Sequence, residues 1–102
     1  MTDAETILTA LLESRCVSFT YDGKPRTVEV HAVGVTSKGR QVFRGYQVAG
    51  ERHGWALYSL DKVEPDSVVL TERPSLAPRE GYTMGDKQLV TIHLQIHTEK
   101  AA

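Results

Sequence analysis

Short runs of alternating apolar and polar residues, separated by turn signals, are the feature that most constrains the fold of this chain. Residues 17–21 alternate in this way, and Asp22-Gly23 follows directly as a hairpin turn signal. The pattern recurs, with turns about every 8–12 residues, in 27–35, 41–48, 55–60 and 68–70. Successive side chains of a strand point to opposite faces of a sheet. The alternation therefore predicts four or five short strands in a small antiparallel sheet or barrel.

A helix is expected before the first strand. Thr2 and Glu5 have the spacing of a capping box, in which each side chain bonds an otherwise free backbone N–H group. Apolar residues recur at helical spacing at Ala4, Ile7, Leu8, Leu11 and Leu12. A helix of two or three turns is marginal alone, so we expect this apolar stripe to pack on the strands.

The chain after residue 70 is less regular. The stretch Thr71–Gly85 contains two prolines and two glycines, and it predicts a loop or an extended arm that either has a function or wraps the body. Alternation returns over 90–96 and predicts a final strand. Gly34 lies inside an earlier strand pattern and indicates a bulge there. We expect one domain, with helix and barrel over 1–72 and the loop and last strand over 73–102.

Charge and cysteine content narrow the function classes. The net charge of −1 excludes a uniformly basic protein that coats nucleic acid, but residues 15–62 hold eight basic and four acidic residues, so an anionic partner is expected there. The single Cys16 excludes internal disulfides and multi-cysteine zinc sites. There is no run of roughly 20 apolar residues and no signal-peptide pattern at the N-terminus. We expect a cytoplasmic protein without a membrane partner.

No catalytic motif is visible, so we do not expect an enzyme, a metal site or a cofactor. GxSxG, GxGxxG and GxxxxGK motifs do not occur in the sequence. His93 and His97 have a zinc-ligand spacing only on a helix; on a strand, four residues span about 13 Å. Cys16 is expected to be a buried, unreactive thiol.

Arg44 is the most informative polar residue. It shares a strand face with Val42, Tyr46 and Val48, and a guanidinium on an apolar face is costly unless it is paired or meets a ligand. Beside Tyr46 it suits a planar anion, by bidentate contact and stacking. The alternative is a structural ion pair with Glu29 or Asp61.

The segments VEVHAVGV, GRQVFRGYQVAG and GWALYSLDKV occur in an order that resembles the WYL domain. The resemblance covers roughly residues 5–64, and PREGYTMGDKQL resembles the tail of short stand-alone bacterial members. There are departures. The Trp-Tyr-Leu triplet falls at Gln41-Val42-Phe43, Val30 replaces a usual proline, and Lys62 replaces a usual arginine.

The resemblance implies an SH3/Sm-like barrel of about five strands that senses a ligand in transcriptional or phage-defence regulation. It implies nucleotide or single-stranded nucleic-acid binding through His31, Arg44, Tyr46 and Lys62. Trp55 joins this set as either a stacking platform or a core residue, and His31 is alternatively a satisfied strand residue. Because one helix precedes the strands, we expect no helix-turn-helix in this chain. A different possibility is a module for a partner protein or homo-oligomer that uses the strand near residues 89–97.

Overall fold

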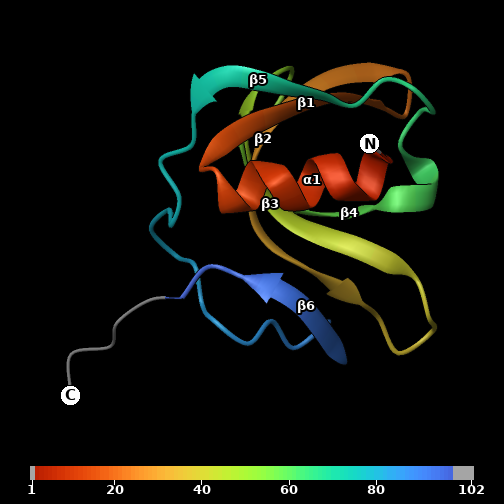
Figure 1. The fold of residues 1–102 in the computed structure, drawn as a ribbon, viewed down its shortest axis with the longest axis vertical. Coiled ribbons are helices and arrows are strands. Elements are labelled where there is room, and N and C mark those ends of the chain that lie inside the picture. The colour runs from red at the N-terminus through yellow and green to blue at the C-terminus, as the bar shows by residue number, and fades with distance from the viewer. Residues whose placement is uncertain (1, 98–102) are drawn as a thin grey trace.

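The computed structural model describes residues 2–97 as one helix and six strands in a mainly β fold (Figure 1). The elements in chain order are α1 (Asp3–Leu12), β1 (Arg15–Tyr21), β2 (Lys24–Val35), β3 (Gln41–Ala49), β4 (Gly54–Ser59), the 3-10 turn η1 (Leu60–Lys62), β5 (Val69–Pro74) and β6 (Thr91–Gln95). The prediction of a mainly β chain with one N-terminal helix is confirmed.

Helix α1 begins where the capping box predicts. The Thr2 hydroxyl accepts the Glu5 N–H at 3.1 Å, and the Glu5 carboxylate accepts the Thr2 N–H at 2.8 Å. Ile7 of the predicted stripe is buried in the core together with Ala10, which the stripe did not include, whereas Leu12 at the end of the helix is exposed. Figure 1 shows the helix lying over the sheet, so burial against the strands stabilises an element too short to be stable alone.

The sheet is open. Its strand order is β4-β3-β2-β1-β5, and β6 pairs with β2 beside this path. Along one edge of the long strand β2, the first half pairs with β1 and the second half pairs with β6. No pairing of β4 with β5 closes the sheet among residues 2–97, so the expected closed barrel is not observed.

The turn between β1 and β2 has the chemistry that the sequence indicates. Asp22 and Gly23 have φ angles of 53° and 74°, and two consecutive residues with positive φ make a tight hairpin that matches strand twist. The hairpin fixes the register that pairs Val17 with Val28. Both side chains are fully buried as a result.

Aromatic rings fill the core between α1 and the sheet. Phe19 lies edge-on to Phe43 at 5.4 Å and to Tyr58 at 5.2 Å between ring centroids, and Phe43 stacks on Tyr58 at 5.2 Å. Tyr58 is 1% exposed and donates its hydroxyl hydrogen to Gln47 Oε1 at 2.9 Å. These rings come from three strands, so they fix the inward face of β1, β3 and β4.

The pairing of β2 with its neighbours is irregular at two places, His31 and Gly34. His31 is an extra residue between the pairs Val30–Gly45 and Ala32–Arg44, which makes it a bulge in β2. The irregularity expected at Gly34 is present, as a shift in the β2–β6 register between Val33 and Gly34. A Cβ at position 34 would overlap the Thr91 carbonyl oxygen, so only glycine lets β6 approach this closely.

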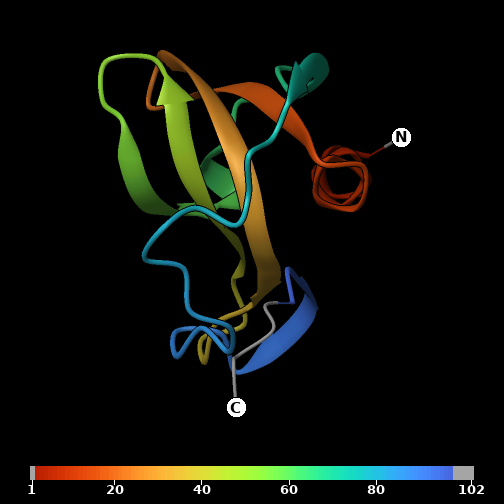
Figure 2. The same cartoon turned by 90° about the vertical axis from the view of Figure 1, so that its left-hand side faces the viewer.

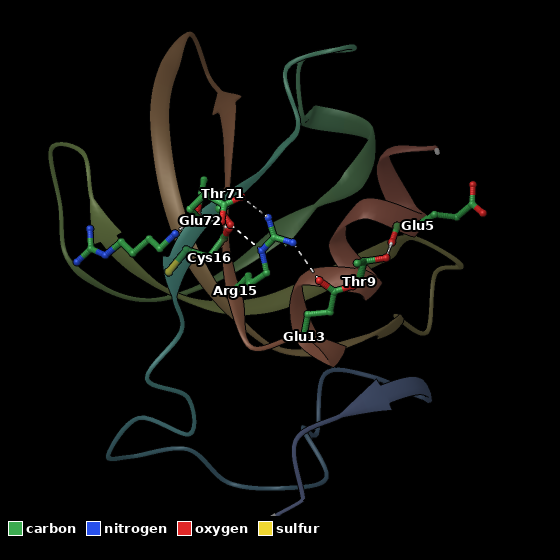
Figure 3. Close-up of polar contacts among 8 residues, drawn as sticks. Glu5, Thr9, Glu13, Arg15, Cys16, Thr71 and Glu72 are labelled. Carbon is green, nitrogen blue, oxygen red and sulfur yellow. Dashed lines mark hydrogen bonds and ion pairs between the residues drawn. The ribbon is translucent and has the colours of Figure 1, made fainter.

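Arg15 joins the end of α1 to β5 (Figure 3). Its Nη1 lies 3.0 Å from the Glu13 carboxylate, its Nη2 lies 3.2 Å from that of Glu72, and its Nε donates to the Thr71 carbonyl at 2.8 Å. Cys16 follows with no exposed surface, as expected. Burial raises the pKa of the Cys16 thiol, which keeps the thiol protonated and unreactive.

Candidate functional site

Residues 75–90, which we call the covering segment, run over the outer face of β2, β3 and β4. Figure 2 shows this segment crossing in front of the strands before it reaches β6. It contains no strand or helix. Two arginine–carboxylate pairs, one at each end of the segment, attach it to the sheet.

The first attachment is an ion pair between Glu29 and Arg79. The Glu29 side chain is 2% exposed, and its Oε1 accepts the Arg79 Nε–H at 2.7 Å. Its Oε2 accepts the Leu76 backbone N–H at 2.6 Å and faces Arg79 Nη2 at 3.3 Å. A buried carboxylate is tolerated only with such a set of donors. This part of the covering segment therefore completes the environment of Glu29.

His31 lies under the same attachment and has no exposed surface. Its Nδ1 faces the Glu29 carbonyl at 2.9 Å, and its Nε2 accepts the Arg79 backbone N–H at 3.0 Å. A carbonyl only accepts, so the ring is neutral with its hydrogen on Nδ1. Burial lowers the pKa of His31. Of the two interpretations made from the sequence, the geometry matches a satisfied strand histidine.

Tyr46 is packed between Arg79 and Trp55. The Arg79 guanidinium lies 4.9 Å from the centre of the Tyr46 ring. The ring of Trp55, which is paired with Tyr46 across β3 and β4, meets it edge-on at 5.3 Å. Trp55 also lies 4.6 Å from the His31 ring. These three predicted residues therefore come together in one cluster, with Arg79 over the Tyr46 ring.

The second attachment pairs Arg44 with Asp86. Arg44 Nε donates to Asp86 Oδ2 at 2.7 Å, and Nη2 lies 3.4 Å from Oδ1. This hydrogen bond lowers the pKa of Asp86. The structural ion pair considered for Arg44 is present, but its partner is neither Glu29 nor Asp61. Glu29 is taken by Arg79, and Asp61 faces Arg40 at 3.7 Å.

A pocket of about 530 Å³ lies beside this second pair. Its lining residues come from β3, β4 and the covering segment: Arg44, Trp55, Gly81, Tyr82, Thr83, Met84, Gly85, Asp86 and Lys87. The rings of Trp55 and Tyr82 are 24° from parallel, with centroids 6.3 Å apart. We call this the Trp55 pocket. It combines an aromatic wall with charged groups, the composition of many small-molecule sites.

The wall formed by the covering segment is fixed from behind by β6 and the residue after it. The Tyr82 hydroxyl donates to the Ile96 carbonyl at 2.8 Å, and the Gly85 N–H donates to Gln95 Oε1 at 2.9 Å. Burial raises the pKa of Tyr82, so its hydroxyl remains a donor near neutral pH. The pocket is therefore largely preformed.

The sequence led to two of the pocket residues, Arg44 and Trp55, and missed Tyr82, Met84 and Lys87. A signal was present, because in GYTMGDK an aromatic residue stands between two closely spaced glycines and two charged residues follow the second glycine. Lys62 is not part of the pocket. It is exposed on η1, at the right of Figure 1, whereas the covering segment lies at the left and bottom.

Within residues 2–97, no three histidine, cysteine or carboxylate side chains are grouped so as to hold a metal ion. In the same range, no helix has both the length and the apolar character needed to cross a bilayer. Comparison with family models, curated proteins and solved structures gave no match to this chain.

Proposed function

We propose that this protein is a regulatory ligand-binding module whose ligand is a nucleotide or single-stranded nucleic acid held in the Trp55 pocket. We also propose that the chain is a WYL-like domain and that its open sheet is related to the SH3/Sm-like barrels. The observation that carries it is the pocket itself, in which the Trp55 and Tyr82 rings stand beside Lys87.

The pocket offers two kinds of interaction that a nucleotide needs, aromatic stacking for the base and a positive charge for the phosphate. Aromatic rings stack on bases with little dependence on base identity. Lys87 lines the pocket and forms no ion pair with any other described residue, so its ammonium is available to a phosphate. Of the two roles considered for Arg44, the structure contains the ion pair, in which Asp86 engages the guanidinium and the pocket wall is held in place.

Trp55 makes the proposal directly testable, since it is the only tryptophan and it lines this pocket. Titration with nucleoside monophosphates and a short single-stranded oligonucleotide, at two salt concentrations, should quench the emission. Tyr82→Leu should weaken binding by about 5- to 100-fold through lost stacking. Lys87→Gln should weaken it several-fold and reduce the salt dependence by about one phosphate contact.

Lys62→Gln is the matched control, because Lys62 is an exposed lysine outside the pocket that the family resemblance nevertheless favours. Unchanged affinity in this variant supports the Trp55 pocket as the site. The proposal would be overturned if the emission were not quenched at low salt, or if Lys87→Gln and Tyr82→Leu bound the ligand as tightly as the wild-type protein.

A second candidate function is assembly through β6. This strand pairs with β2 along one edge, its other edge is unpaired among the described strands, and the adjacent Val90 is 66% exposed. An open edge with a neighbouring apolar residue is a site for pairing with another strand. Sedimentation of the wild-type protein and of Val90→Lys at micromolar concentration tests this candidate. If the wild-type protein sediments as a monomer, assembly into a homo-oligomer is excluded.

A further inference from the structure

A second, smaller pocket lies where the turn after β1 meets the turn after β3. It has a volume of about 180 Å³, which is enough for a tetrahedral oxyanion. Its lining residues are Lys24, Pro25, Arg26, Gln47, Glu51 and Arg52. None of them lines the Trp55 pocket. We call it the Arg26 pocket.

The Arg26 guanidinium is held in place by uncharged groups. It lies over the rings of Tyr21 and Tyr58, 5.3 Å and 6.0 Å from their centroids. Its Nη1 donates to Gln47 Oε1 at 3.5 Å, an oxygen that also accepts the Tyr58 hydroxyl at 2.9 Å. Gln47 is in turn fixed, because it is 4% exposed and its Nε2 donates to the Ala49 carbonyl at 3.2 Å. Arg26 is thus preorganised without a carboxylate partner.

One donor of this guanidinium is unsatisfied. Arg26 Nε is buried and has no hydrogen-bond partner among residues 2–97. A buried N–H group without an acceptor is costly, and such groups in a native fold call for a specific explanation. Nε itself is shielded from solvent, so an anion in the pocket meets the part of the Arg26 side chain that lines it and supplies the negative charge that its uncharged neighbours lack.

The other charges around the pocket point the same way. Arg52 is exposed and makes no ion pair with another described residue. Lys24 pairs with Glu51 at 2.8 Å between Nζ and Oε2. Lys24 first, and Arg26 and Arg52 to a smaller extent, lower the pKa of the Glu51 carboxylate. Three cations therefore surround one carboxylate, and the pocket keeps a net positive charge.

We propose that the Arg26 pocket binds a phosphate group, with the fixed guanidinium of Arg26 as its central contact and Arg52 and Lys24 as mobile cations around it. Glu51 forms an ion pair with Lys24 when the pocket is empty, and it competes with the anion for that ammonium group. This site is separate from the Trp55 pocket, and neither depends on the other.

The test follows the Arg26 Nε–H resonance by NMR, at constant ionic strength, in separate titrations with inorganic phosphate and with a dinucleoside monophosphate. The resonance should shift saturably. Arg52→Gln should weaken binding about 3- to 10-fold, and Glu51→Gln should tighten it several-fold because it frees Lys24. Arg40→Gln is the matched control, since Arg40 is an exposed arginine beside Asp61 that does not line the pocket.

The two ligands distinguish the sources of the phosphate. A shift with the free anion alone assigns the pocket to small phosphates, and a shift with the dinucleotide assigns it to phosphodiesters. An unmoved Arg26 Nε–H in both titrations, or equal weakening by Arg52→Gln and Arg40→Gln, overturns the proposal. Trp55 fluorescence recorded on the same samples reports separately on the other pocket, so failure of one site is not confused with failure of the other.

Discussion

The backbone N–H of Arg79 donates a hydrogen bond of 3.0 Å to Nε2 of His31, a residue 48 positions earlier in the chain. This bond requires an unprotonated Nε2, while Nδ1 donates to the Glu29 carbonyl. One of the bonds that attach the covering segment to the sheet therefore forms only while the buried His31 imidazole is neutral.

Acid should weaken this attachment. The folded-state pKa of His31 is lowered by burial, so the unfolded state binds the proton more readily. Stability from this group is complete above the unfolded pKa of about 6.5. It is lost as the pH falls from there through the folded pKa, at up to about 1.4 kcal/mol per pH unit. Urea unfolding between pH 8 and pH 5 measures the slope.

His31→Gln should reduce that slope, because glutamine does not titrate. His93→Gln is the matched control, since His93 is an exposed histidine on β6, and the slope should fall more in His31→Gln than in this variant. An identical pH dependence in wild type and His31→Gln would show that another group is responsible.

The Glu29–Arg79 pair should respond unequally to loss of either partner. Arg79→Leu leaves the buried Glu29 carboxylate without its cation and should cost about 2–4 kcal/mol, less than a fully buried pair because Arg79 is about one-third exposed. Glu29→Gln keeps an acceptor for the Leu76 N–H and should cost about 1–2 kcal/mol. Denaturant unfolding gives both values, and the reverse order would contradict this account.

Gly34→Ala should release β6. The added methyl group would overlap the Thr91 carbonyl oxygen, which is backbone and cannot turn aside as a side chain can. Hydrogen exchange should show lost protection over 91–95 with little change in β1. The comparison is Gly45→Ala, where the methyl group would overlap the Val28 side chain in the core; its cost of about 1–3 kcal/mol should be global. Intact protection of β6 in Gly34→Ala would contradict the close approach.

Cys16 should react with a thiol reagent only when the protein opens. Its side chain has no exposed surface, and its pKa is raised by burial. The reagent therefore cannot reach the sulfur, and the thiol is not ionised to the reactive thiolate. The labelling rate measured with Ellman's reagent should rise in step with unfolding in urea. Rapid, urea-independent labelling would show that β1 and β5 separate easily.

Local rules predicted most of the fold. The Thr2–Glu5 capping box, the Asp22-Gly23 turn and the period-two runs identified α1, the first hairpin and the last strand, because each depends on residues close in sequence. Sheet closure was not predictable in this way. Whether β4 meets β5 depends on long-range pairing, and alternation within a strand carries no information about it.

The candidate site was predicted less well, for a physical reason. Alternation in β2 separates Glu29 and His31 from the core valines and indicates a polar outer face, yet both residues are buried. A periodic pattern shows which face a side chain takes, but not whether an irregular segment covers that face. The partners Arg79 and Asp86 lie 50 and 42 residues away from Glu29 and Arg44, within a segment that has no periodicity.

The covering segment carries both its own anchors and most of the lining of the Trp55 pocket. Arg79 and Asp86 anchor it, and Asp86 also lines the Trp55 pocket. Thr83, Met84 and Lys87 line the pocket without forming either anchor or belonging to the aromatic core. Substitutions at these three positions can therefore change what the pocket accepts while the helix and sheet stay intact. In evolutionary terms, the ligand preference that we propose for this pocket is free to diverge at little risk to folding, and the same positions are the natural ones to randomise in a library.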